Sequence, residues 1–145
     1  MNKYVIILIV LAVIVGASIV FKDSLGTNDN KVVATGIVRE ITIRAKQNEW
    51  RFDPDVIEVD QGDTVKLTVI NEDDFDHGIQ IDAFGVSKRI PANGTVKAEF
   101  VVTKSGEFPF FCSVPCGDGD VADGTHRGHF DQKGKIVVRN AIKTQ

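Results

Sequence analysis

The side chains of this chain that can bind metal gather in one stretch near the C-terminus. Residues 110–138 contain both cysteines, Cys112 and Cys116, together with His126 and His129, and the third histidine, His77, lies upstream in DDFDHGIQI. Thiolate sulfur and imidazole nitrogen are the ligands that copper, zinc and iron prefer, whereas magnesium and calcium prefer oxygen. The sequence therefore predicts a transition-metal centre.

Two other interpretations of the cysteines stay open. A structural disulfide suits an exported domain, but a bridge from Cys112 to Cys116 closes a very short loop and constrains the unfolded chain little. A structural zinc site is the second, because two cysteines and two histidines satisfy tetrahedral zinc. We favour a redox metal over both.

Acidic residues lie on both sides of this centre. Asp118, Asp120 and Asp123 lack the spacing and the closing glutamate of an EF-hand, so we expect an acidic loop rather than a calcium site. Such a loop would steer a cationic partner protein, and His126 in it would be solvated. The stretch from Glu72 to Asp76 is expected to be a solvated turn, one of whose carboxylates could orient His77 through its second ring nitrogen.

The elements that position these residues have the period of β-strands. Apolar residues alternate with polar ones in short segments between turns, and no segment has a helical stripe. Because Trp50 and Phe52 are two residues apart, we expect them to share a buried face. About seven or eight short strands result, which predicts an all-β, antiparallel Greek-key sandwich. The alternating residues include Ile41 and Ile43, Val56 to Val59, Val65, Leu67 and Val69, His77, Ile79 and Ile81, Val96, Ala98 and Phe100, and residues 135–138.

The N-terminus differs from the rest in composition. Residues 4–21 carry no charge over 18 positions, which nearly suffices for a helix to cross a hydrocarbon core of about 30 Å. We predict a transmembrane anchor at 4–21 after a cytoplasmic segment 1–3, then a tether at 22–35, the metal-binding domain at 36–140 and a tail at 141–145. Lys3 weakly favours a cytoplasmic N-terminus, which puts the domain on the extracytoplasmic side of the plasma membrane. A signal peptide cleaved near Val15-Gly16-Ala17 is the alternative.

The charge balance gives little sign of a nucleic-acid partner. The net charge is −3, and a phosphate-binding surface needs clustered lysine and arginine that this sequence does not show.

Four segments, in order, resemble a known family. EWRFDPDVIEVDQGDTVKLTVIN, DHGIQI, GEFPFFCSVPCG and GHFDQKGKIVV are similar to the cupredoxin domain of the dinuclear copper-A type, as in cytochrome c oxidase subunit II and nitrous oxide reductase. The resemblance covers nearly all of residues 36–138 and implies a Greek-key cupredoxin sandwich with two copper ions. It implies ligands from His77, Cys112, the backbone carbonyl of Val114, Cys116 and His129.

The sequence departs from that family pattern at two points. Twelve residues separate Cys116 from His129 where the family has three, so DGDVADGTH is interpreted as an insertion. The family's weak axial methionine is replaced by Gln132, whose harder oxygen is expected to lower the reduction potential. A rival alignment makes His126 the imidazole ligand and puts His129 in the axial place.

The resemblance implies electron transfer, either as the electron-entry domain of a terminal oxidase or as an independent tethered carrier, with a cytochrome or an oxidase subunit as redox partner. The residues themselves reveal no nucleophile, general base or substrate pocket, so the domain alone is not expected to be an enzyme. A copper-delivery protein and a mononuclear cupredoxin are the alternatives.

Overall fold

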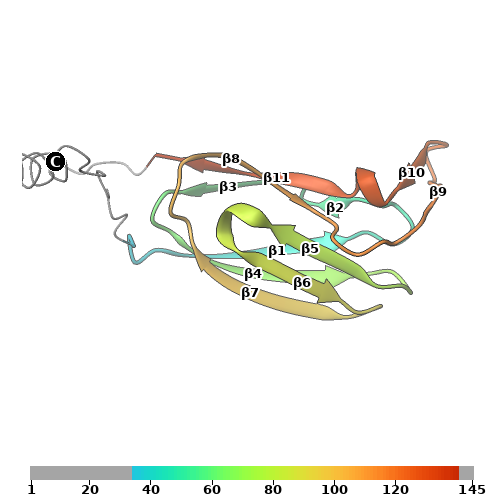
Figure 1. The fold of residues 1–145 in the computed structure, drawn as a ribbon, viewed down its shortest axis with the longest axis horizontal. Helices are drawn as coiled ribbons and strands as arrows, with labels where there is room; N and C mark the ends of the chain where they lie inside the picture. Colours follow the sequence, from blue (N-terminus) through green and yellow to red (C-terminus); the bar gives the residue numbers. More distant parts are fainter. Residues whose placement is uncertain (1–33, 141–145) are drawn as a thin grey trace, which may run out of the picture. The chain divides into compact units, whose positions relative to one another are not determined.

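The computed structural model describes residues 34–140 (Figure 1). The predicted anchor at 4–21, most of the predicted tether and the predicted tail lie outside the described residues. Within 34–140 there is no helix long and apolar enough to cross a membrane. The described chain forms eleven strands and two short 3-10 turns: β1 Val38–Ala45, β2 Phe52–Asp53, β3 Val56–Asp60, β4 Thr64–Asn71, β5 His77–Ile81, η1 Asp82–Phe84, β6 Val86–Ile90, β7 Thr95–Val101, β8 Gly106–Phe111, β9 Asp118–Asp120, β10 His126–Gly128, η2 His129–Asp131 and β11 Lys133–Arg139.

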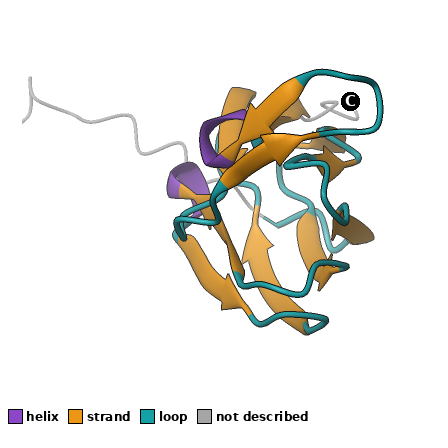
Figure 2. Ribbon diagram, turned by 90° about the vertical axis from the view of Figure 1, so that its right-hand side faces the viewer, coloured by secondary structure: helices purple, strands orange, loops and turns teal. Residues whose placement is uncertain are grey.

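The strands form a two-sheet sandwich and a separate hairpin (Figure 2). One sheet has the order β2-β1-β4-β7, the other has the order β3-β11-β8-β5-β6, and β9 pairs with β10. The prediction of antiparallel pairing is wrong at two places, because β1 runs parallel to β4 and β3 runs parallel to β11. Both parallel pairs join strands that are not consecutive in the sequence, so no turn between them could reveal their direction.

The core lies between the two sheets and follows the predicted alternation. In β4 every second side chain, Val65, Leu67 and Val69, is buried, while Lys66 on the other face is exposed. Aromatic rings link the sheets, since Phe52 of β2 lies 5.6 Å from Phe110 of β8 between ring centroids. The sandwich is therefore held by apolar side chains that alternate along each strand.

Several of the eleven strands have weak signals in the sequence. In β6, the exposed residues Ser87, Lys88 and Arg89 separate the buried ends Val86 and Ile90. Buried and exposed residues therefore do not alternate along this strand. β2 has only two residues, and β9 and β10 have three each. The sequence indicated seven or eight strands because these four elements are too short or too polar to alternate.

The two ends of the sandwich carry different features. The described chain enters and leaves at one end, where Gln61 N–H donates to the carbonyl of Arg139 at the end of β11, and the hairpin β9–β10 lies at the opposite end (Figure 1). Loops gather at the ends of such a sandwich. The hairpin end also contains the cysteines and histidines.

Candidate metal centre

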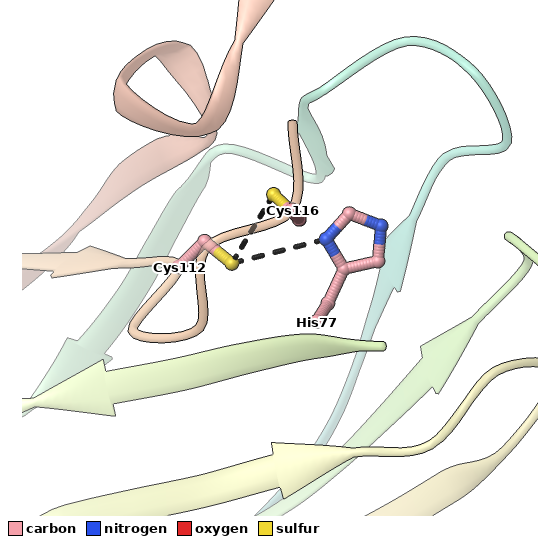
Figure 3. Close-up of side chains that lie close together, drawn as sticks. All are labelled: His77, Cys112 and Cys116. Carbon is pink, nitrogen blue, oxygen red and sulfur yellow. Dashed lines mark hydrogen bonds between the residues drawn. The ribbon is translucent and has the colours of Figure 1, made fainter. Parts of the chain in front are cut away.

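Cys112 and Cys116 meet in one buried loop between β8 and the hairpin. Their Sγ atoms lie 3.7 Å apart, and both side chains are buried. Within the part of the chain that the structure describes they form no disulfide, since a bond needs a separation of about 2.05 Å. The two sulfurs are therefore available together as ligands (Figure 3).

His77 approaches the first of these sulfurs from the start of β5. Its imidazole is fully buried, and its Nδ1 lies 3.8 Å from Cys112 Sγ (Figure 3). The backbone N–H of Gly78 donates to the same sulfur over 3.3 Å. A side chain at Gly78 would clash with Ser113, so a glycine here lets the strand approach the cysteine loop closely.

The second ring nitrogen of His77 is held by Asp73. Nε2 lies 2.6 Å from Oδ2 of this buried carboxylate, and the other oxygen, Oδ1, accepts the backbone N–H of Asn48 over 2.6 Å. The backbone N–H of Asp73 donates to Asn71 Oδ1. The expectation that a carboxylate of this acidic stretch orients His77 therefore agrees with the geometry, and the residue is Asp73.

The remaining predicted residues surround the two sulfurs. The carbonyl oxygen of Val114 lies 3.2 Å from Cys112 Sγ. His129 Nδ1 lies 3.6 Å from Cys116 Sγ, and Gln132 Oε1 lies 3.5 Å from the same sulfur. All six residues expected as ligands thus come together at one place.

His126 lies apart from this group, on the hairpin. Its ring is exposed, with Nε2 2.7 Å from Asp118 and Nδ1 2.8 Å from Asp120. The rival alignment, which needs His126 at the sulfurs, does not match this geometry. The expected acidic loop is instead the paired hairpin β9–β10, in which the imidazole bridges two carboxylates that would otherwise repel each other.

Trp50 supports the cysteine loop in a way that the sequence did not indicate. It is buried, as expected for a core residue, but its indole N–H donates to the carbonyl oxygen of Cys116 over 3.0 Å. It lies outside β2 with φ 45°, and its ring stacks on Phe75, which in turn contacts His77. No local sequence signal marks this left-handed conformation, because residues other than glycine rarely adopt it.

The family profile described as a cupredoxin-like domain matches residues 9–138. The chain belongs to this family. No sequence among curated proteins matches the chain.

Solved structures of copper proteins share the fold at low sequence identity. Reduced auracyanin from Roseiflexus castenholzii has 18% identity and a TM-score of 0.58, covering 72% of this chain and 99% of that one. The metal-binding domain of the Cu(I)-exporting P-type ATPase of Streptococcus pneumoniae, with Cu(I), has 17% identity and a TM-score of 0.55, covering 72% and 88%. A chain of a heme-copper terminal oxidase dimer has 18% identity and a TM-score of 0.56, covering 94% and 98%.

The electrostatics of the cupredoxin site favour a thiolate at Cys112. The adjacent Cys116 thiol, together with His77 and the Gly78 N–H, lowers the pKa of Cys112 to about 3 against the opposing effect of burial. The same contact with Cys112, together with burial, raises the pKa of Cys116. Burial lowers the pKa of His77, but Cys112 and Asp73 raise it more. The site thus holds one thiolate beside an imidazole, and the thiolate is the form that binds metal.

The donor set of the site fits a soft or borderline transition metal. Two sulfurs, two imidazole nitrogens and two amide-type oxygens come together around the two buried cysteines, and such donors suit copper. Gln132 is fully buried, yet its Nε2 has no hydrogen-bond partner among the described residues. A buried polar atom without a hydrogen-bond partner calls for an explanation. The other end of the same amide, Oε1, faces Cys116 and can serve as a metal ligand there.

Proposed function

We propose that this cupredoxin transfers electrons through a copper-A-like centre that holds two copper ions. His77, Cys112, the carbonyl of Val114, Cys116, His129 and Gln132 would supply the ligands. The bound copper would supply the one-electron redox change, and the chain's own residues would fix its surroundings.

The pairing of donors around the two sulfurs carries this proposal. Cys112 Sγ has one imidazole nitrogen and one backbone oxygen beside it, from His77 and Val114. Cys116 Sγ likewise has one imidazole nitrogen and one amide oxygen, from His129 and Gln132. Each sulfur therefore has its own nitrogen and oxygen, and the two sulfurs lie side by side. This twofold set supports a dinuclear site more than a mononuclear one, which needs only one thiolate.

The surrounding residues restrict movement of the ligands. Asp73 holds the far nitrogen of His77, Trp50 holds the carbonyl of Cys116, and Cys112 N–H donates to the carbonyl of Gln132 over 2.9 Å. Such contacts fix ligand orientation. A site whose ligands stay in place on gain or loss of an electron reorganises little, which favours fast electron transfer.

We further propose that residues 4–21 anchor the domain on the extracytoplasmic face of the plasma membrane, where a cytochrome or an oxidase subunit is its redox partner. The uncharged run at 4–21 supports the anchor. Similarity to the terminal oxidase chain over 94% of this chain supports a role as an oxidase electron-entry subunit. An independent tethered carrier is the other form of the same function.

Copper handling without redox change is the second candidate. It is favoured by similarity to the domain of a Cu(I)-exporting ATPase that is described with Cu(I). Adjacent thiols such as Cys112 and Cys116 also suit Cu(I).

Reversible redox chemistry distinguishes these functions. The full chain in detergent is loaded with copper, the metal is counted, and the protein is taken through cycles of oxidation and reduction. Electron transfer predicts two coppers per chain and an unchanged metal content after several cycles. Loss of copper on oxidation, or a colourless protein that holds only Cu(I), would favour copper handling. Tight binding of zinc in preference to copper would favour the structural zinc site.

A further inference from the structure

The β9–β10 hairpin joins two of the expected ligands. Cys116 lies two residues before β9, and His129 follows the last residue of β10. The backbone N–H of His129 donates to the carbonyl of Gly117 over 2.9 Å, and this hydrogen bond closes the hairpin at its base. The closed hairpin therefore fixes how the two ligands lie relative to each other.

The hairpin also covers Trp50. A Cβ added at Gly119 of β9 would lie 2.6 Å from a ring carbon of Trp50, so the backbone of this strand rests directly on the indole. The indole is buried, and its N–H donates to the carbonyl of Cys116 over 3.0 Å. Its ring stacks on Phe75, which contacts the ring of His77. Trp50 thus connects the hairpin to the cysteine loop and to the first imidazole.

Little of the hairpin itself is buried. Its strands pair over three residues each, and Val121 is the one buried residue of the described stretch 118–128. Its exposed contacts include the imidazole of His126, which lies between the carboxylates of Asp118 and Asp120. A two-stranded hairpin is marginally stable by itself, and exposed ion pairs contribute little. We therefore expect the hairpin to open locally while the sandwich stays folded.

We propose that the hairpin controls the exchange of copper at the site, and that Trp50 is the positioning residue through which it acts. In the closed hairpin, Trp50 holds the carbonyl of Cys116, and the hydrogen bond at the base holds His129. Opening removes both contacts and loosens the half of the donor set around Cys116. His77 and Cys112 keep their contacts within the sandwich. Release and uptake of copper therefore follow the opening of the hairpin.

Copper binding at this site, which both proposed functions require, is the premise of this inference. The segment DGDVADGTH, an insertion relative to the family pattern, thereby has a role. A long loop between two ligands is costly to order. The closed hairpin holds the ends of that loop together and retards the loss of copper.

Two measurements follow the opening and the copper. Trp50 is the only tryptophan of the chain, so the full chain in detergent gives one indole N–H signal in NMR. The rate of hydrogen exchange of this N–H in the metal-free chain reports the population of the open hairpin. The second measurement is the rate at which the full chain, loaded with Cu(I) and kept in ascorbate, loses copper to an excess of bathocuproine disulfonate.

Two variants weaken the hairpin in different ways. His126→Ala removes the imidazole between the two strands, and Gly119→Ala places a methyl group against the Trp50 ring. The matched control is Lys135→Ala, which removes an exposed cross-strand ion pair with Glu107 outside the hairpin. His126→Ala should speed indole exchange and copper loss by the same factor, about two- to fivefold, because both follow the open population. Gly119→Ala should speed both at least as much, and the control should change neither.

Trp50→Phe tests the connection itself. It keeps an aromatic ring but removes the N–H that bonds the carbonyl of Cys116, so copper loss should become about tenfold faster. Phe84→Leu is the control for lost aromatic packing, since Phe84 stacks on Phe100 in another part of the core. Copper loss from Trp50→Phe at the rate of this control would overturn the role of Trp50.

Other results overturn the role of the hairpin. Faster indole exchange without faster copper loss would show that the hairpin covers Trp50 but leaves copper exchange unaffected. Wild-type rates in both hairpin variants, or an equal change in Lys135→Ala, would also contradict the proposal. If the wild type takes up no copper, the proposed function fails, while indole exchange in the metal-free variants still decides whether the hairpin holds Trp50.

Discussion

Replacing Asp73 by asparagine tests whether this carboxylate orients His77. The side chain is buried and uses both oxygens, one for His77 Nε2 and the other for the backbone N–H of Asn48. Asparagine keeps the shape but has one acceptor oxygen, so either the buried ring of His77 or the N–H of the exposed Asn48 loses its partner. Leaving a buried donor unpaired costs about 1–3 kcal/mol.

The expected result has two parts. The free energy of unfolding of the metal-free chain, measured in urea, falls by about 1–3 kcal/mol. The copper affinity, measured by competition with a chelator, falls about 10–100-fold, as for other residues that hold a metal-binding histidine. Asp74→Asn is the matched control, since Asp74 is adjacent but exposed, and among the described residues its carboxylate accepts a hydrogen bond only from the side chain of Asn93. Equal stability and equal copper affinity in the two variants would refute the role of Asp73.

Three further changes test the rest of the account. Gln132→Met is expected to raise the reduction potential, because a thioether replaces a harder oxygen; a redox titration in which the methionine variant has the lower potential would contradict this. Burial raises the pKa of Asp63, but Arg39, with its Nε 2.7 Å away, and neighbouring donors lower it more. The resulting stability is present at neutral pH and is lost as pH falls below about 4. Asp63→Asn should therefore lower the free energy of unfolding by about 2 kcal/mol at pH 7 and by less at pH 3. An equal loss at both pH values would argue against a stabilising role of the ionised Asp63. Gly134→Ala would clash with Phe110 and should cost about 1–3 kcal/mol in urea unfolding; wild-type stability would show that the strands can separate to admit a methyl group.

Much of the site could be predicted because its residue types are scarce. With two cysteines and three histidines in the whole chain, few combinations can form a soft metal site. Alternation of apolar residues predicted a sandwich, and a sandwich brings the start of one strand near a distant loop. The resemblance then supplied Val114 and Gln132, which no residue-type argument would select, and the structure places both beside the sulfurs.

The remaining features depend on contacts that the sequence does not show. The four carboxylates of residues 72–76 were equivalent candidates to orient His77, and only the turn geometry selects Asp73. The hairpin brings His126 of β10 beside Asp118 and Asp120 of β9, a cross-strand contact that the sequence spacing does not show. Such contacts join residues that are brought together by a turn or by the fold. The alternation of apolar residues along a strand gives no information about them.

The most direct measurement is the EPR spectrum of the oxidised, copper-loaded full chain. A dinuclear centre predicts seven hyperfine lines from one unpaired electron shared equally by two copper nuclei, as expected for the twofold donor set around Cys112 and Cys116. A four-line pattern from a single copper would contradict the dinuclear centre and leave a mononuclear cupredoxin in its place.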